Sequence, residues 1–135
     1  MKTRSELESK FAEIYGYSAG DSYEIRIFNA LESICRGQCR EEEIIEIFDT
    51  SVFSNGKAGL VLGCDSIYVN DVANFTPKFN LQYSDIAEMK IEGDRFLGLD
   101  LTALIITSKS GREYKVSINP SGLEKLKSFL EYARG

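Results

Sequence analysis

The sequence predicts an α+β fold: a strongly bent antiparallel β-sheet or barrel of about six or seven strands, capped by a C-terminal helix and preceded by an N-terminal helical pair. After Glu43, short runs of β-branched and aromatic residues are separated by turn-forming residues, a pattern typical of consecutive antiparallel strands. From Pro120 onward, and also before Glu43, apolar residues recur at helical spacing. We therefore expect a helical extension over residues 1–40 and one β-domain over residues 41–135.

A first helix is predicted over roughly residues 4–15. Thr3 and Glu6 have the spacing of a capping box, in which a hydroxyl and a carboxylate bind free backbone amides at a helix start. The apolar positions of this helix, spaced i, i+4 and i+7, are Leu7, Phe11 and Ile14. They share one face, which needs an apolar surface to pack against.

A second helix is predicted after a break at Gly16 and Gly20. Asp21 or Ser22 can cap its start, because short polar side chains accept hydrogen bonds from the first free amides of a helix. Gly37 is placed to end it, since glycine tolerates the left-handed conformation common at helix ends. The apolar stripe predicted for this helix consists of Ile27, Phe28, Leu31, Ile34 and Cys35.

The β-domain is predicted as a series of runs that follow one another along the chain. Phe79, Leu81 and Tyr83 alternate with other residues, as a strand with one buried face requires. Gly111 lies in a hairpin loop, where glycine can adopt a positive φ. Pro77 is expected in a longer connection. The predicted runs are 44–48, 59–63, 66–69, 79–83, 86–91, 101–107 and 114–118.

The final helix is predicted to begin at Pro120. Asn119 is a favourable N-cap, and proline suits the first helical position, where its missing amide hydrogen costs nothing. The apolar stripe of this helix consists of Leu123, Leu126, Phe129, Leu130 and Ala133. A strongly bent sheet leaves an open end, which this stripe can cover.

The charge of the chain disfavours two classes of partner. Its 135 residues carry a formal net charge of −5, whereas non-specific nucleic-acid binding needs a surplus of Lys and Arg to displace counterions from phosphates. An anionic membrane surface likewise attracts basic segments. The sequence has no run of about 18 apolar residues to span a membrane and no apolar signal-peptide core. We therefore expect a cytoplasmic protein that binds no nucleic acid.

The sequence shows no motif of a catalytic or metal centre. It has no histidine and three cysteines, an odd number that indicates reduced thiols in a cytoplasm. Zinc sites combine two pairs of Cys or His, so we expect no metal, with Cys35 as core filler and Cys39 as a bystander. The glutamates of residues 41–43 are expected to be solvated. No phosphate-binding loop or nucleophile elbow is present, and we predict neither catalytic residues nor a cofactor.

Residues 42–91 resemble the pleckstrin-homology-like (PH-like) superfold, including its GRAM-type and bacterial branches. A strand ending near Phe48 leads through Gly56-Lys57 to a second strand and an Asp65 turn, and a later strand ends in Ser84-Asp85-Ile86. With the terminal helix, the resemblance covers roughly two-thirds of the chain. It implies a bent sheet with a C-terminal helix, in a family whose members are mostly of unknown function and often carry a preceding helical segment.

The PH-like resemblance also implies a non-catalytic binding module. Phosphoinositide binding needs several cations on the first strands, yet the only one between Glu43 and Tyr68 is Lys57. We therefore expect a protein or peptide partner rather than a membrane lipid. Binding is expected through a sheet edge or through the loop between the first two strands. The candidate partner-binding residues on that loop are Phe53, Asn55 and Lys57.

Two other roles stay open at this point. A small acidic protein is suited to neutralise a toxin or an enzyme, as an immunity protein or inhibitor, because acidic charge steers it to the basic clefts of nucleic-acid enzymes. An exposed strand edge together with the helical pair is also compatible with a homodimer.

Overall fold

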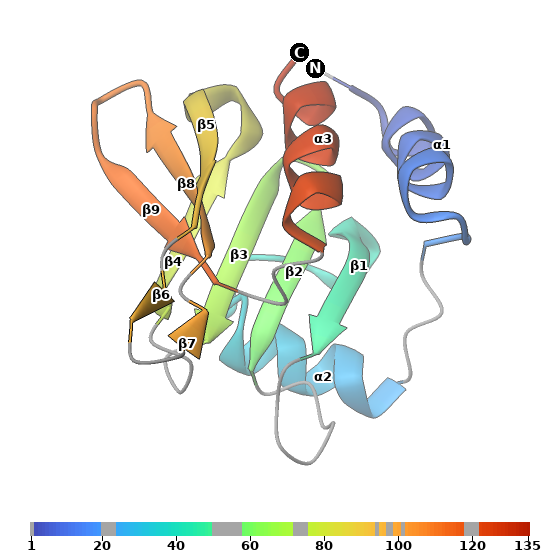
Figure 1. The fold of residues 1–135 in the computed structure, drawn as a ribbon. Helices are drawn as coiled ribbons and strands as arrows, with labels where there is room; N and C mark the ends of the chain where they lie inside the picture. The colour runs from blue at the N-terminus through green and yellow to red at the C-terminus, as the bar shows by residue number, and fades with distance from the viewer. Residues whose placement is uncertain are drawn as a thin grey trace.

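The computed structural model describes residues 2–19, 24–49, 58–71, 76–93, 95–96, 99–100, 102–117 and 122–135. Within these residues the α-helices are α1 (Arg4–Tyr15), α2 (Glu24–Ser33) and α3 (Leu123–Ala133) (Figure 1). The strands are β1 (Ile44–Asp49), β2 (Gly59–Gly63), β3 (Ser66–Asp71), β4 (Thr76–Gln82), β5 (Ile86–Glu92), β6 (Arg95–Phe96), β7 (Leu99–Asp100), β8 (Ala103–Ser108) and β9 (Glu113–Val116). The short 3-10 helices η1 (Glu41–Glu43) and η3 (Tyr83–Asp85) directly precede β1 and β5.

Among the described residues the strands form two larger antiparallel sheets and no closed barrel. The first sheet has the order β1-β2-β3-β4 and the second has the order β5-β8-β9, while β6 and β7 form a separate ribbon. The larger sheets meet where β4 lies beside β9, and the ring centroids of Phe79 and Tyr114 are 4.7 Å apart there. The predicted α+β class, the antiparallel pairing and the C-terminal helix are confirmed.

The main core lies between the two larger sheets, α1 and α3 (Figure 1). Phe11 of α1 and Phe129 of α3 are fully buried, and their rings meet edge to face with centroids 6.1 Å apart. The hydroxyl of Tyr83 donates a 2.7 Å hydrogen bond to the carbonyl of Gly63 inside this core. The main core consists of Leu7, Phe11, Ile45, Leu60, Leu62, Ile67, Val69, Phe79, Leu81, Tyr83, Ile86, Leu104, Ile106, Val116, Leu123, Leu126, Phe129, Leu130 and Ala133.

A second, outer cluster lies on the opposite face of the first sheet, where α2 packs. Adjacent residues in a strand point to opposite faces, so Leu60 and Leu62 enter the main core while Val61 points toward α2. Strand β2 is consequently buried on both faces. The side-chain amide of Asn70 donates a 2.6 Å hydrogen bond to the carbonyl of Ser33 and ties β3 to the end of α2. The outer cluster consists of Ala30, Ile34, Cys35, Cys39, Ile44, Val61 and Tyr68.

The prediction for α1 is confirmed at both ends. The backbone amide of Glu6 donates to the hydroxyl of Thr3 at 3.2 Å, and the carboxylate of Glu6 accepts from the amide of Thr3 at 3.1 Å, which completes the capping box. Gly16 ends the helix in the left-handed region with φ 81°. Leu7 and Phe11 are fully buried on the predicted face.

The predicted stripe of α2 is wrong at one position. Phe28 is 61% exposed, whereas Ala30, which the prediction omitted, is fully buried. The inward face follows the spacing i, i+3, i+4 and i+7 from Ile27 through Ala30 and Leu31 to Ile34. Phe28 lies beside this face rather than on it, because each residue turns by about 100° around a helix.

The predicted caps of the later helices are only partly described. Asp21, Ser22, Asn119 and Pro120 lie outside the described residues. Helix α3 begins later than predicted, with Gly122 at its N-cap position and no side-chain hydrogen bond there. All members of its predicted apolar stripe are buried.

Pro77 lies within β4 and not in a connection, so this prediction is wrong. Strand β4 is an edge strand of the first sheet, where a residue without an amide hydrogen need not leave a ladder bond unmade. The pairing of β3 with β4 is irregular beside it, between Val69 and Asp71, where Asp71 is the partner of Thr76.

Both N-terminal helices pack against the strands, α1 in the main core and α2 in the outer cluster. The division of the chain into a helical extension over residues 1–40 and a separate domain over residues 41–135 stays a prediction. The described helices are each too short or too polar to cross a membrane.

Candidate functional site

The predicted partner-binding residues fall in a part of the chain that the structure does not describe. Phe53, Asn55 and Lys57 lie between Asp49 and Ala58, where the described residues stop and resume. Their role stays a prediction. The described surface offers a different candidate, the edge of the second sheet.

Strand β5 forms this edge. In the described part of the chain it pairs only with β8, so its other side carries backbone groups without a strand partner. Met89 and Ile91 are half-buried against the main core, while Glu88, Lys90 and Glu92 are exposed on the other face. Lys90 and Glu92 form an ion pair of 2.8 Å. An edge of this kind is the template to which an extended peptide can add as a further strand.

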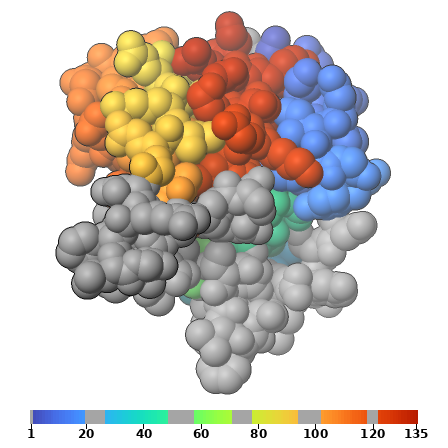
Figure 2. Space-filling model, viewed as in Figure 1, coloured from blue at the N-terminus to red at the C-terminus, as the bar shows by residue number. Residues whose placement is uncertain are grey.

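Helix α3 lies beside the β5 edge. Figure 2 shows β5 in yellow next to α3 in red on one face, with α1 in blue on the other side of α3. Arg134, which follows α3, donates a 2.6 Å hydrogen bond to the carbonyl of Ala87. Ala87 is the extra residue of an irregularity between Ile86 and Glu88 in the pairing with β8. The start of the edge is therefore occupied, and the stretch that has no strand neighbour on this side among the described residues is 88–92.

A small cavity lies near the start of this edge, between the β2–β3 turn and the end of α3. Its volume is about 180 Å³, and Lys2, Cys64, Asp65 and Arg134 line it together with uncharged neighbours. Burial raises the pKa of the Cys64 thiol, which keeps the sulfur protonated near neutral pH and makes it a poor nucleophile. The cavity is smaller than the roughly 300 Å³ of typical small-molecule sites, so we assign it no ligand.

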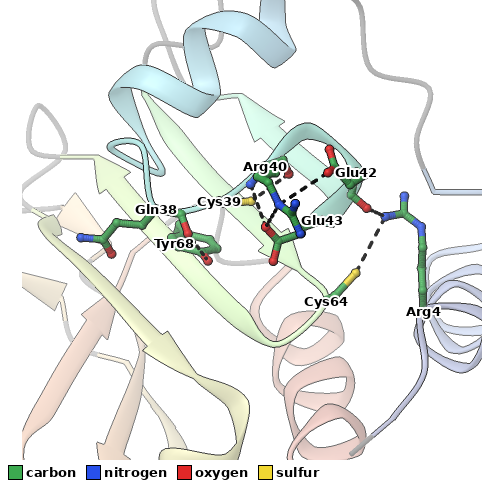
Figure 3. Close-up of polar contacts among 8 residues, drawn as sticks. All are labelled: Arg4, Gln38, Cys39, Arg40, Glu42, Glu43, Cys64 and Tyr68. Carbon is green, nitrogen blue, oxygen red and sulfur yellow. Dashed lines mark hydrogen bonds and ion pairs between the residues drawn. The ribbon is translucent and has the colours of Figure 1, made fainter.

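Arg4 of α1 joins the N-terminal helix to the segment before β1 (Figure 3). Its guanidinium donates hydrogen bonds to the carbonyls of Glu42 and Ile44, the latter at 2.8 Å, and lies 3.8 Å from the sulfur of Cys64. It also pairs with the carboxylate of Glu8 at 2.5 Å. Because the guanidinium already makes these contacts within the chain, we assign Arg4 a structural role and not a role in ligand binding.

The acidic run of residues 41–43 has a structural role. The amide of Arg40 donates to the Glu43 carboxylate at 3.0 Å, and its guanidinium lies 3.3 Å from the same oxygen (Figure 3). The backbone hydrogen bond from Arg40, assisted by its side chain, lowers the pKa of Glu43. A carboxylate held ionised in this way is not suited to act as a general acid near neutral pH.

Cys35 and Cys39 lie together in the turn that follows α2. Their side chains are 1% and 6% exposed and are hydrogen-bonded to one another. Cys35 fills the outer cluster as predicted, and Cys39 belongs to the same cluster rather than being a bystander. Within the described residues, no three Cys, His, Asp or Glu side chains are grouped to hold a metal ion.

The β5 edge escaped the sequence analysis because strand order, and not composition, decides which strand lies at an edge. One signal was present: charges at every second position from Glu88 to Glu92 are typical of an exposed edge strand.

Comparison of the chain with protein-family models, with curated proteins and with solved structures found no match.

Proposed function

We propose that this protein is a non-catalytic binding module that takes an extended segment of a partner protein along the open stretch of β5. The observation that carries the proposal is the edge itself: within the described chain, β5 has a strand neighbour on one side only. An added strand would satisfy the free backbone groups, and its alternate side chains would contact Met89 and Ile91. The exposed Glu88 favours a segment with a basic residue opposite it, whereas Glu92 is already paired with Lys90.

We also propose that the chain belongs to the bacterial PH-like domains and works in the cytoplasm. Support for the family comes from the sequence resemblance, from the order of four strands, three strands and a final helix, and from the burial of the α3 stripe between the sheets. Support for the compartment comes from Cys35, Cys39 and Cys64, which are all free thiols in the structure.

The test starts with a pull-down from the source cell lysate with the full chain as bait, followed by mapping of the bound protein to a short segment. Hydrogen exchange of the complex should then show slower exchange for the amides of residues 88–92. Ile91→Lys should weaken binding by about tenfold or more, since a charge would replace an apolar contact at the edge. Ser9→Lys, which adds the same side chain to the exposed surface of α1, should leave affinity unchanged.

Two results would contradict the proposal. The first is protection confined to residues 50–57 with full affinity of the Ile91→Lys variant, which would restore the loop that the sequence analysis favoured. The second is specific retention of a lipid or small molecule without a protein. Neutralisation of a toxin encoded beside this gene would instead favour the acidic-inhibitor alternative.

A further inference from the structure

The turn between α2 and η1 places two thiols side by side. The amide of Gln38 donates a 3.0 Å hydrogen bond to the carbonyl of Cys35, and the residues between them, Arg36 and Gly37, have φ 53° and 75°. Positive φ at both central residues characterises a type I′ turn. The tight turn returns the chain so that the side chain of Cys39 meets that of Cys35 through a hydrogen bond.

We propose that Cys35 and Cys39 are a modification site, which forms a reversible intramolecular disulfide when the protein meets a peroxide. A disulfide requires the sulfurs to approach to about 2.05 Å. The two thiols are hydrogen-bonded to one another, flank one turn and lie in the same buried cluster, so they are placed to make this approach. The third cysteine, Cys64, lies on the β2–β3 turn beside Arg4 and stays outside the pair.

The surroundings of the two thiols differ, and this difference decides which thiol reacts first with the peroxide. The hydrogen bond from Cys35 lowers the pKa of Cys39, although burial and the carboxylates of Glu43 and Asp65 oppose this. The same hydrogen bond and burial raise the pKa of Cys35. Cys39 is also the more exposed of the two, and Tyr68 faces it from β3. Because its side chain is 6% exposed against 1% for Cys35, Cys39 is the thiol that the oxidant reaches first.

The reaction balances with one molecule of hydrogen peroxide. The Cys39 thiolate attacks one peroxide oxygen, the O–O bond breaks, and the products are a sulfenic acid and hydroxide, which takes up the proton that Cys39 released. The sulfur of Cys35 then attacks the sulfur of the sulfenic acid, the S–O bond breaks, and the hydroxyl leaves as water with the proton of Cys35. Two thiols and one peroxide thus give one disulfide and two waters.

The disulfide would fix the link that connects α2 to the first sheet. Gln38 lies between the two cysteines, its carbonyl accepts a 3.4 Å hydrogen bond from the hydroxyl of Tyr68, and its side chain binds that of Asn80. Oxidation therefore constrains the segment through which α2 is held on β3 and β4. The effect is separate from the β5 edge, which belongs to the other sheet.

The experiment uses the full chain carrying Cys64→Ser, so that only the pair remains, and mild treatment with hydrogen peroxide. The intact mass should fall by two hydrogen atoms, both free thiols should be lost on titration after unfolding, and dithiothreitol should restore them. Peptide mapping should find Cys35 joined to Cys39. Equilibration with glutathione buffers should show that the disulfide is harder to reduce in the folded protein than in urea, because the folded turn holds the sulfurs together.

Three results would overturn the proposal. They are two thiols that stay free under peroxide, oxidation of Cys39 to a sulfinic acid without the pair bond, and a disulfide that joins two chains. A further check uses Cys39→Ala in the same background. This variant should keep Cys35 unmodified, since the thiol that reacts first is missing, and oxidation of Cys35 at the original rate would contradict the assigned order.

Discussion

The main core and the outer cluster are two ways in which this chain buries apolar surface, and they differ in how far apart their residues lie in the sequence. The main core joins Leu7 of the first helix to Ala133 of the last, through strands of both sheets. The buried members of the outer cluster, among the residues that the structure describes, lie between Ala30 and Tyr68. The first holds the whole molecule together, while the second holds α2 on the first sheet. Damage to each should therefore have effects of different extent.

The largest effect is expected from Phe129→Ala in the main core. Phe129 is fully buried, and its ring contacts those of Phe11 and Tyr83 at centroid distances of 6.1 and 6.2 Å. Loss of such a ring leaves a cavity, and the free energy of unfolding should fall by about 3–5 kcal/mol. Urea denaturation measures it, with Ser128→Ala on the exposed side of the same helix as the control. A loss below about 1 kcal/mol would show that α3 is not essential to the main core.

A smaller and more local effect is expected from Ile34→Ala in the outer cluster. Ile34 is fully buried, but its cluster is small and includes partly buried neighbours that can close part of the cavity. The expected loss is about 2 kcal/mol, at the low end for this substitution. Hydrogen exchange should become faster in α2 while α1 and α3 keep their protection.

The matched control for Ile34→Ala is Glu32→Ala, which removes an exposed side chain at the end of α2, two residues before Ile34. Equal acceleration of exchange in all three helices of the Ile34→Ala variant would mean that the two clusters unfold as one unit. The comparison between a global core and a local cluster would then be wrong.

The local patterns of this chain were predictable, because they depend on neighbours in the sequence. The capping box at Thr3, the apolar face of α1 and the stripe of α3 each follow from helical spacing. The hairpin at Gly111, which has φ 90°, follows from the backbone freedom of glycine. These features need no knowledge of what the element packs against.

Features set by distant pairing were not predictable in the same way. The division into two larger sheets depends on which strands meet in space, and the open edge of β5 follows from that division. One sign of the outer cluster was nevertheless present: the run Gly59–Gly63 is apolar without alternation, which is typical of a strand buried on both faces. Phe28 was misplaced because an apolar side chain near a stripe need not be part of it.

A smaller loss of unfolding free energy is expected when a buried tyrosine loses its hydroxyl, and this loss should differ between the two clusters. The hydroxyl of Tyr83 donates a 2.7 Å hydrogen bond in the main core, whereas that of Tyr68 makes a longer bond of 3.4 Å to the carbonyl of Gln38. Tyr83→Phe should cost about 1 kcal/mol near neutral pH, because it removes a hydrogen bond that is buried in the main core. Tyr68→Phe should cost less, since the bond it removes is weaker.

The pH dependence of the same variants gives a second measurement. Burial raises the pKa of Tyr83 well above its ordinary value near 10. A raised pKa in the folded state means that the stabilisation is complete below pH 10 and is lost as the pH rises above it, when the unfolded chain ionises more readily. The free energy of unfolding should fall less steeply above pH 10 in Tyr83→Phe than in the unmodified protein. Equal slopes would show that Tyr83 is accessible to water.

The smallest effect is expected from Phe28→Ala on α2. Phe28 is 61% exposed while Ala30 of the same helix is fully buried, so removal of the ring takes no atoms from the outer cluster. The free energy of unfolding should change by no more than about 0.5 kcal/mol at any protein concentration. A loss that grows with protein concentration would mean instead that a second copy of the chain covers the ring, because only association makes stability depend on concentration. That result would establish the homodimer that the sequence analysis left open. The outer cluster would then also hold α2 in the position where it contacts the second copy.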